Sequence, residues 1–128
     1  MIDVAAAVLV ENGKILIAKR AQRQRLAGKW EFPGGKIERG EDAGSCLVRE
    51  LREEFDLDVE VDAFLGDSTY RYDFGTVKLV FYLCRLKGGT LNPKVHQEYR
   101  WVLPHELKDY DFAKADELMI EELAKLDF

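Results

Sequence analysis

The sequence predicts an α/β (α+β) fold that is built around a mixed β-sheet. Several short apolar runs indicate strands, and two longer amphipathic stretches indicate helices. These elements do not alternate strictly along the chain, so a purely parallel sheet is not expected. The 128 residues, of which 47% are hydrophobic, suit one domain over residues 1–128.

The first third of the chain predicts a β-hairpin followed by a loop. Residues 4–10 and 14–18 are apolar and rich in β-formers, and the Asn-Gly pair at 12–13 between them signals a tight turn. Residues 20–29 are polar, and we expect a loop there. The Pro-Gly-Gly sequence at 33–35 is expected to form a turn that breaks any regular element.

The middle of the chain predicts an amphipathic helix over residues 42–55. Its apolar residues recur at spacings of three and four and comprise Ala43, Cys46, Leu47, Leu51 and Phe55. Further strands are expected at residues 59–65, 68–72, 77–86 and 100–102. A short helix at 104–108 is expected to precede a C-terminal amphipathic helix at 115–126, with apolar Leu118, Met119, Leu123 and Leu126.

Charge and composition exclude several classes of partner. The chain has 19 basic and 24 acidic residues and a net charge of −5, so it lacks the basic surface that a nucleic-acid polymer requires. Two cysteines without zinc-type spacing indicate reduced core thiols in a cytoplasmic protein. The sequence has no apolar run of membrane-spanning length and no signal-peptide start, so no membrane partner is expected.

Three glutamates in the predicted helix indicate a metal site. Glu50, Glu53 and Glu54 stand at positions i, i+3 and i+4 and project from one helix face. Like charges at these spacings destabilise a helix by about 0.2–0.5 kcal/mol per pair, and a hard divalent cation such as Mg²⁺ removes that penalty. The alternative is a solvated acidic face that Arg49 and Arg52 soften. A glycine pair before the helix, where the backbone can approach a ligand, favours the metal site.

Residues 35–57 resemble the Nudix box of the Nudix hydrolases. The box residues of that pattern fall at the required spacings here and are Gly35, Glu41, Arg49, Glu50, Leu51, Glu53, Glu54 and Leu57. The final glycine of the box is Asp56 in this chain, a residue type that tolerates the left-handed helix end. Residues 5–20, 30–35 and 110–116 look like the MutT branch of the family. The resemblance implies the Nudix fold, an α/β/α sandwich around a mixed β-sheet.

The resemblance also implies a reaction and a set of site residues. A nucleoside triphosphate is cut to a nucleoside monophosphate and pyrophosphate with Mg²⁺, for which Mn²⁺ can substitute. The implied metal ligands are the carbonyl of Gly35 and the carboxylates of Glu50, Glu53 and Glu54, with Arg49 orienting a carboxylate and Glu41 supporting the loop. The general base is Glu53 in some relatives and a loop glutamate in others. Glu98 is the loop candidate here, and a solvated loop charge is the equal alternative for it. We expect His96 and His105 to be surface residues.

Four residues are expected to bind the nucleotide, namely Arg20, Phe32, Phe81 and Asp116. Asp116 stands where MutT-like proteins carry an asparagine that reads oxidised guanine, and its carboxylate can accept from cytosine N4 or from guanine N1 and N2. The plain alternative for Asp116 is a charge at a helix N-terminus. Phe32 and Phe81 can stack on the base, although Phe81 suits the core slightly better. Arg20 can contact the base or a phosphate.

The expected role is sanitising of the nucleotide pool in DNA repair, for example the hydrolysis of 8-oxo-dGTP. CTP or a modified dCTP is an alternative substrate. Two further alternatives are an ADP-ribose or dinucleoside polyphosphate hydrolase, whose extra motifs are not found here, and a non-catalytic nucleotide sensor, which typically loses box glutamates. The oligomeric state is left open between monomer and homodimer.

Overall fold

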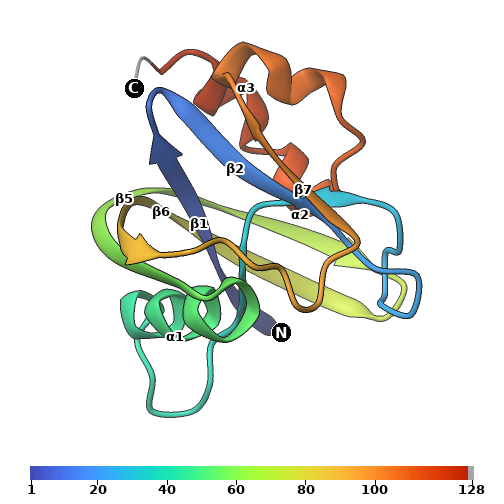
Figure 1. Ribbon diagram of the computed structural model, residues 1–128. Helices are drawn as coiled ribbons and strands as arrows, with labels where there is room; N and C mark the ends of the chain where they lie inside the picture. Colours follow the sequence, from blue (N-terminus) through green and yellow to red (C-terminus); the bar gives the residue numbers. More distant parts are fainter. Residues whose placement is uncertain (127–128) are drawn as a thin grey trace.

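A mixed β-sheet forms the centre of the computed structural model, which describes residues 1–126 (Figure 1). The strands are β1 (Ile2–Glu11), β2 (Lys14–Lys19), β3 (Trp30–Glu31), β4 (Gly34–Lys36), β5 (Leu57–Tyr72), β6 (Gly75–Gly89) and β7 (Glu98–Val102). The helical elements are α1 (Ala43–Phe55), the 3-10 helix η1 (Pro104–Asp109), α2 (Lys114–Glu117) and α3 (Ile120–Ala124). The sheet runs in the order β3-β2-β1-β6-β5, while β4 pairs with β1 and β7 pairs with β2.

The central strand β1 makes the sheet mixed. One edge of β1 pairs in parallel with β6 from Ile2 to Val10. The other edge pairs antiparallel with β4 at residues 4–6 and with β2 at residues 10 and 11. The predicted mixed sheet is therefore confirmed.

Each face of the sheet carries its own apolar core, because successive side chains of a strand point to opposite faces. In β1, Ala6 and Val8 belong to one core, and Ala5, Ala7 and Leu9 belong to the other. Helix α1 covers the second core, whereas η1, α2 and α3 cover the first (Figure 1). This arrangement is the α/β/α sandwich that the sequence predicts.

Helix α1 forms where the apolar spacing predicts it. The N–H of Ser45 donates to the side chain of Asp42 at 2.7 Å, which caps the first turn. The buried side chains of the helix are Cys46, Leu47, Leu51 and Phe55. Burial of one such large apolar side chain stabilises the fold by about 1.5–3 kcal/mol, so α1 is firmly fixed on the sheet. Its polar side, which carries the glutamates, is fixed with it.

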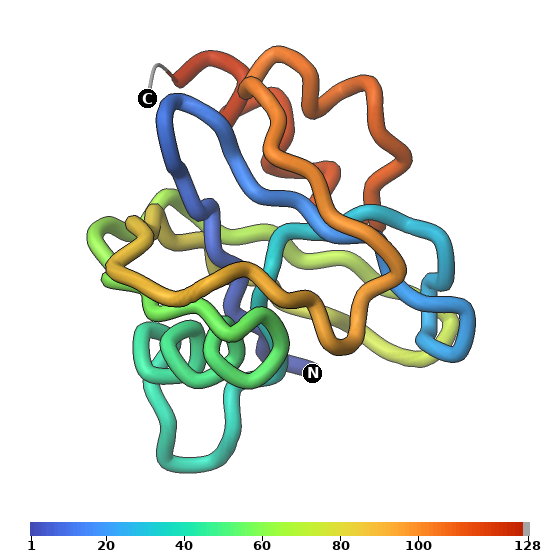
Figure 2. Tube along the Cα trace, viewed as in Figure 1, coloured from blue at the N-terminus to red at the C-terminus, as the bar shows by residue number. Residues whose placement is uncertain are grey.

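Asp56 ends α1 in the left-handed conformation, with φ 58° and ψ 32°. Its carboxylate accepts a hydrogen bond from Asn92 Nδ2 at 3.1 Å and pairs with Lys94 Nζ at 2.7 Å. The contact with Lys94 lowers the pKa of Asp56 most, and the hydrogen bond from Asn92 lowers it further. Figure 2 shows the segment around Asn92 as the amber trace that runs over the end of α1. The side chain thus offsets the backbone strain that a residue other than glycine meets here.

We expect Asp56→Ala to lower the melting temperature by a few degrees at pH 7. Alanine keeps the strained backbone and loses both side-chain contacts, whereas Asp56→Gly loses the contacts and relieves the strain. Asp56→Gly should therefore melt above Asp56→Ala, as thermal unfolding followed by circular dichroism can measure. The opposite order would show that the left-handed conformation is not a source of strain.

Residues 34–36 form strand β4, although the sequence predicts a turn that breaks regular structure at this point. The strand places Gly34 opposite Ala6 and Gly35 opposite Ala5 in β1. A Cβ atom on Gly34 would overlap the carbonyl oxygen of Ala5. The glycines therefore serve close pairing with β1, and the prediction of a break is wrong for residues 34–36.

Strand β5 is one continuous strand of 16 residues, where the sequence predicts two strands at 59–65 and 68–72. Its pairing with β6 contains register shifts at Asp58/Val59, Val61/Ala63 and Phe64/Gly66. Such bulges absorb extra residues without ending a strand. The expected interruption near residue 66 is therefore a bulge.

The single C-terminal helix predicted over residues 115–126 is wrong, because this segment forms the two short helices α2 and α3. The N–H of Met119 donates to the carbonyl of Asp116 at 3.1 Å, which makes a tight turn between them. The turn directs Met119 and Leu123 into the core and leaves Leu118 exposed. None of the helices in residues 1–126 has the length and apolar composition needed to cross a membrane.

Candidate active site

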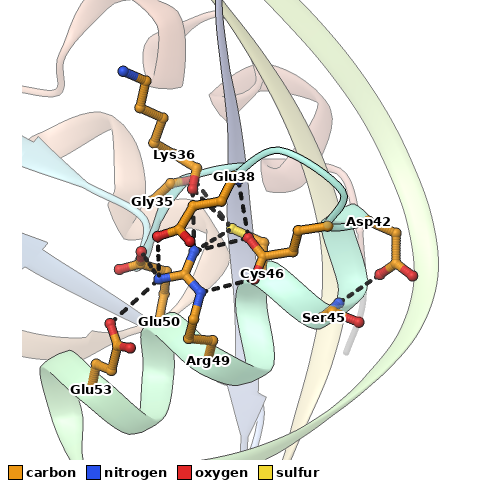
Figure 3. Close-up of polar contacts among 10 residues, drawn as sticks. Gly35, Lys36, Glu38, Asp42, Ser45, Cys46, Arg49, Glu50 and Glu53 are labelled. Carbon is orange, nitrogen blue, oxygen red and sulfur yellow. Dashed lines mark hydrogen bonds and ion pairs between the residues drawn. The ribbon is translucent and has the colours of Figure 1, made fainter.

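Arg49 lies at the centre of a cluster of ion pairs on α1 (Figure 3). Its guanidinium donates to both carboxylate oxygens of Glu41, at 2.8 and 2.9 Å. Its Nη1 donates to Glu50 at 2.7 Å and to Glu53 at 3.3 Å, and its Nη2 donates to the carbonyl of Lys36 at 3.3 Å. The bonds from Arg49 lower the pKa of Glu41 to about 2. Arg49 therefore fixes both the loop before α1 and the orientation of Glu50.

The three glutamates of α1 do not face the same space, which differs from the expectation. Glu50 and Glu54 line a cavity that is open to the surface, whereas the side chain of Glu53 is 60% exposed and lines a hollow of about 650 Å³ on the other side of α1. The turn of about 100° between the neighbours Glu53 and Glu54 is wide enough for their side chains to reach different sides of the shared helix face. The pairing with Arg49 holds Glu53 away from the cavity.

The cavity that Glu50 and Glu54 line has a volume of about 340 Å³. Its charged lining residues are Arg20, Glu31, Lys36, Glu50, Glu54 and Asp116. Gly35 forms part of the wall, and a Cβ atom there would lie 2.7 Å from both carboxylate oxygens of Glu50. A second hollow of about 260 Å³ shares Arg20 and Asp116 and extends the space toward Tyr72 and Phe74. The cavity thus joins the glutamates of α1 to an aromatic recess.

Negative charge at the cavity wall is incompletely balanced. Burial is the main cause that raises the pKa of Glu54, and the adjoining carboxylate of Glu50 raises it further. Within residues 1–126, no three His, Cys, Asp or Glu side chains gather closely enough to hold a metal ion by themselves. Mg²⁺ commonly binds one or two carboxylates and takes waters and substrate phosphates as its other ligands. Glu50 and Glu54 fit a site of this open kind, and the backbone of Gly35 lies beside the carboxylate of Glu50.

Asp116 is buried in the cavity wall, with 5% of its surface exposed. Its Oδ1 accepts the backbone N–H of Phe32 at 3.2 Å. Burial is the main cause that raises the pKa of Asp116, and the negative charge of Glu31 raises it further. Phe32 lines the same cavity and packs against Phe112, with ring centroids 5.2 Å apart. The structure therefore brings Asp116, Phe32 and Arg20 to one space, as the sequence predicts for residues that meet a base.

Phe81 and Glu98, two predicted site residues, lie elsewhere. Phe81 is fully buried and is not among the described residues that line the cavity, so it belongs to the core and not to a base stack. Glu98 begins strand β7, where the sequence predicts a loop, and its carboxylate pairs with Lys19 at 3.6 Å and Arg100 at 3.2 Å. Glu98 is also not among the described lining residues. Strand pairing with β2 places Glu98 beside Lys19 at the start of β7.

Glu31 connects two side chains at the cavity. Its Oε1 accepts a hydrogen bond from Arg20 Nη1 at 2.7 Å, and its Oε2 lies 2.8 Å from His96 Nε2. The ring of His96 stacks on that of Phe55, with centroids 5.0 Å apart. The prediction that His96 lies at the surface is wrong, because these two contacts bury its side chain to 1% exposure. His105 is exposed, as predicted.

A family model identifies the family to which the chain belongs. The family model described as the NUDIX domain matches residues 1–123. This chain belongs to the NUDIX domain family. The Nudix chain is 36% identical over 121 residues to the CTP pyrophosphohydrolase of Escherichia coli K12, covering 94% of this chain and 90% of that protein. It is 38% identical over 125 residues to the putative 8-oxo-dGTP diphosphatase 2 of Mycobacterium tuberculosis H37Rv, covering 95% and 87%.

A solved structure gives the same result for the Nudix fold. The solution structure of the E. coli ORF135 protein superposes with a TM-score of 0.81 at 36% sequence identity. The match covers 94% of this chain and 86% of that one. The α/β/α sandwich is therefore shared over almost the whole chain.

The sequence does not predict Glu31 at the cavity wall or His96 as its partner. Glu31 did carry a signal, because it stands between the buried aromatics Trp30 and Phe32 and must point to the opposite side of the strand. His96 carried no such signal. Its burial depends on Phe55, which is remote in sequence and becomes a neighbour only in the folded chain.

Proposed function

We propose that this Nudix chain is a Mg²⁺-dependent hydrolase that cuts a nucleoside triphosphate to a nucleoside monophosphate and pyrophosphate. One observation carries the proposal: Glu50, Glu54 and the backbone of Gly35 share a cavity of about 340 Å³ with the buried Asp116. A nucleotide needs an anionic wall that can bind a metal for its phosphates and a polar buried group for its base. Both are found in this one cavity.

Glu50, Glu54 and the carbonyl oxygen of Gly35 would hold the metal. When bound, Mg²⁺ polarises phosphoryl oxygens, activates water and neutralises developing charge, and Mn²⁺ should substitute because it favours the same oxygen ligands. Arg49 keeps Glu50 in place through its bond of 2.7 Å. Glu53 would have to leave Arg49 to join the ligands or to act as a base.

The cavity can also orient the rest of the nucleotide. Arg20 and Lys36 are its cationic lining residues within the part of the chain that the structure describes, and both can bind phosphate oxygens. Asp116 is the candidate base reader. A carboxyl group that is protonated can donate as well as accept, which suits the mixed edge of cytosine or guanine. The names of the E. coli and M. tuberculosis relatives make CTP and 8-oxo-dGTP the first substrates to test.

We expect Asp116→Asn to change the ratio of kcat/KM for CTP to that for 8-oxo-dGTP by about tenfold or more, since one base contact is worth about 1–3 kcal/mol of discrimination. Asparagine keeps an acceptor for the N–H of Phe32 and replaces the other oxygen with a donor. Hydrolysis itself should persist. Steady-state kinetics on both nucleotides measures the ratio, and an unchanged ratio would exclude Asp116 as the base reader.

The same substitution should raise the free energy of unfolding at pH 7.5 more than at pH 4. Burial raises the pKa of Asp116 in the folded state, so between the two pKa values the folded chain binds more protons than the unfolded chain. Stability is therefore lost as pH rises from the ordinary carboxyl pKa, about 3.9, through the raised value. Asparagine removes that loss. Urea titrations should show a larger gain at pH 7.5 than at pH 4, and an equal gain at both would show that the proton on Asp116 is not its cause.

A substrate panel with Mg²⁺ tests the proposed function. The panel contains the canonical nucleoside triphosphates, 8-oxo-dGTP, modified dCTP, ADP-ribose and a diadenosine polyphosphate, with separate detection of pyrophosphate and orthophosphate. We expect pyrophosphate from at least one triphosphate and loss of the signal with EDTA. If ADP-ribose or the diadenosine polyphosphate is turned over faster than every nucleoside triphosphate, the substrate class is not the proposed one. Binding without any product would favour a nucleotide sensor.

A further inference from the structure

We infer that His96 is a positioning residue that acts on nucleotide binding through Glu31 and Arg20. The inference rests on the proposed function, because it concerns how the same cavity holds its nucleotide. It gives a role to a buried histidine that the proposed chemistry does not use. The three side chains form one series of contacts from the end of α1 to the cavity wall.

Glu31 is the middle member of this series. Its Oε1 is 2.7 Å from Arg20 Nη1 and its Oε2 is 2.8 Å from His96 Nε2, so each oxygen has its own partner. The side chains of Glu31 and Arg20 are only 17% and 23% exposed, which leaves water little access to either bond. The carboxylate cannot rotate without losing one partner. The position of Arg20 therefore depends on the contact with His96.

The surroundings of His96 fix which ring nitrogen donates to Glu31. An ionised carboxylate only accepts hydrogen bonds, so Nε2 carries the hydrogen in the bond to Glu31. Nδ1 is buried and has no hydrogen-bond partner within residues 1–126. The Nε2–H group thus acts as a fixed donor to Glu31.

The segment before His96 is anchored on the last turn of α1 (Figure 2). The N–H groups of Asn92 and Lys94 donate to the carbonyl oxygens of Phe55 and Glu54, both at 2.9 Å. The ring of His96 then lies nearly parallel to that of Phe55, at an interplanar angle of 20°. The imidazole is therefore held by the same helix end that carries Glu54.

The residue after His96 is anchored next to Arg20. The N–H of Gln97 donates to the carbonyl oxygen of Lys19 at 2.9 Å. Arg20 follows directly and uses its Nε for the carbonyl of Arg25 at 2.6 Å and its Nη1 for Glu31. This arrangement leaves Nη2 for an acceptor oxygen of the nucleotide, because the side chain lines both parts of the cavity. A guanidinium held in advance loses less entropy on binding.

His96→Phe tests this role, because phenylalanine keeps a ring to stack on Phe55 and removes the donor to Glu31. We expect the Kd of a CTP analogue with an α,β-methylene bridge, measured with Mg²⁺ by calorimetry, to rise by about tenfold, as for other residues that orient a binding group. His96→Gln, whose amide can donate in a similar place, should recover most of the loss. The exposed His105 supplies the matched control, and His105→Phe should leave the Kd unchanged.

A double-mutant cycle separates positioning from a general structural effect. If His96 acts through Arg20, His96→Phe should weaken binding in the wild-type background and change the Kd by less than about twofold when Arg20→Ala is already present. An equal loss in both backgrounds would overturn the inference. The kcat of the protein with CTP should change by less than roughly threefold, because only an aligned binding group is lost.

The ligand-free protein gives a readout that needs neither binding nor turnover. The Arg20 Nη1–H signal in ¹⁵N NMR, which reports the bond to Glu31, should be sharp and slow to exchange in the wild type and in His96→Gln, and broadened in His96→Phe. An unchanged signal in His96→Phe overturns the inference even if nucleotides are hydrolysed. Conversely, a broadened signal in a protein that hydrolyses no nucleotide would refute the proposed function alone.

Discussion

Glu54→Gln is expected to lower kcat/KM for the best nucleoside triphosphate by about 100-fold or more, with the fold intact. The substitution keeps the size of the side chain and removes one of the two carboxylates that meet at the cavity wall. A bound metal contributes several kcal/mol to stabilising the transition state, and each 1.4 kcal/mol is about a factor of ten in rate. Because burial already raises the pKa of Glu54, loss of its charge should not destabilise the ligand-free protein.

Two measurements make this prediction decisive. Glu121→Gln, on the exposed surface of α3, is the matched control and should retain wild-type turnover. The concentration of Mn²⁺ needed for half-maximal activity should rise in Glu54→Gln and stay unchanged in the control. Wild-type turnover in Glu54→Gln would exclude Glu54 from the metal site. Glu53→Gln provides a further comparison, since Glu53 reaches the cavity only by leaving Arg49.

Gly34→Ala should have the largest effect on stability, a loss of about 3 kcal/mol or more in the free energy of unfolding. The added Cβ would overlap the carbonyl oxygen of Ala5 and come within 3.1 Å of the Cα of Ala6, and a paired backbone cannot move aside as a side chain can. For a chain of this size, such a loss lowers the melting temperature by roughly 10 °C. Urea or thermal unfolding measures it directly.

Gly40→Ala is the matched control for Gly34→Ala. Gly40 has a positive φ of 81°, but nothing lies within 4 Å of the position where its Cβ would stand. Gly40→Ala therefore measures the effect of conformational strain without a clash, and we expect it to lower the free energy of unfolding by about 1–2 kcal/mol. If both variants lose the same stability, close pairing of β4 with β1 is not what requires glycine at position 34.

Local patterns predicted the parts of the molecule that local forces form. The apolar spacing of Cys46, Leu47 and Leu51 placed α1, and the Asn-Gly pair placed the first hairpin, because both signals act within a few residues. The box spacing singled out the glutamates of α1. The glycine pair at 34–35 predicts close approach of the backbone to a ligand, and the structure places Gly35 beside the carboxylate of Glu50.

The remaining parts depend on contacts between distant residues. The pairing of Gly34 with Ala6 turns an expected break into β4, and only the presence of β1 makes that strand. The partnership of Glu31 with Arg20 and His96 joins three separate segments, so no local pattern reveals it. Helix geometry alone predicts that Glu53 shares the face of Glu50 and Glu54. The structure differs because Glu53 forms an ion pair with Arg49.

A crystal structure with Mn²⁺ and the α,β-methylene analogue of CTP or 8-oxo-dGTP tests the central claim most directly, because anomalous scattering locates the metal. We expect a metal peak within coordination distance of the Glu50 and Glu54 carboxylates and the carbonyl oxygen of Gly35, with phosphate oxygens on its open side and the base beside Asp116. A nucleotide whose phosphates lie outside this cavity, with no metal at these three oxygens, would contradict the assignment.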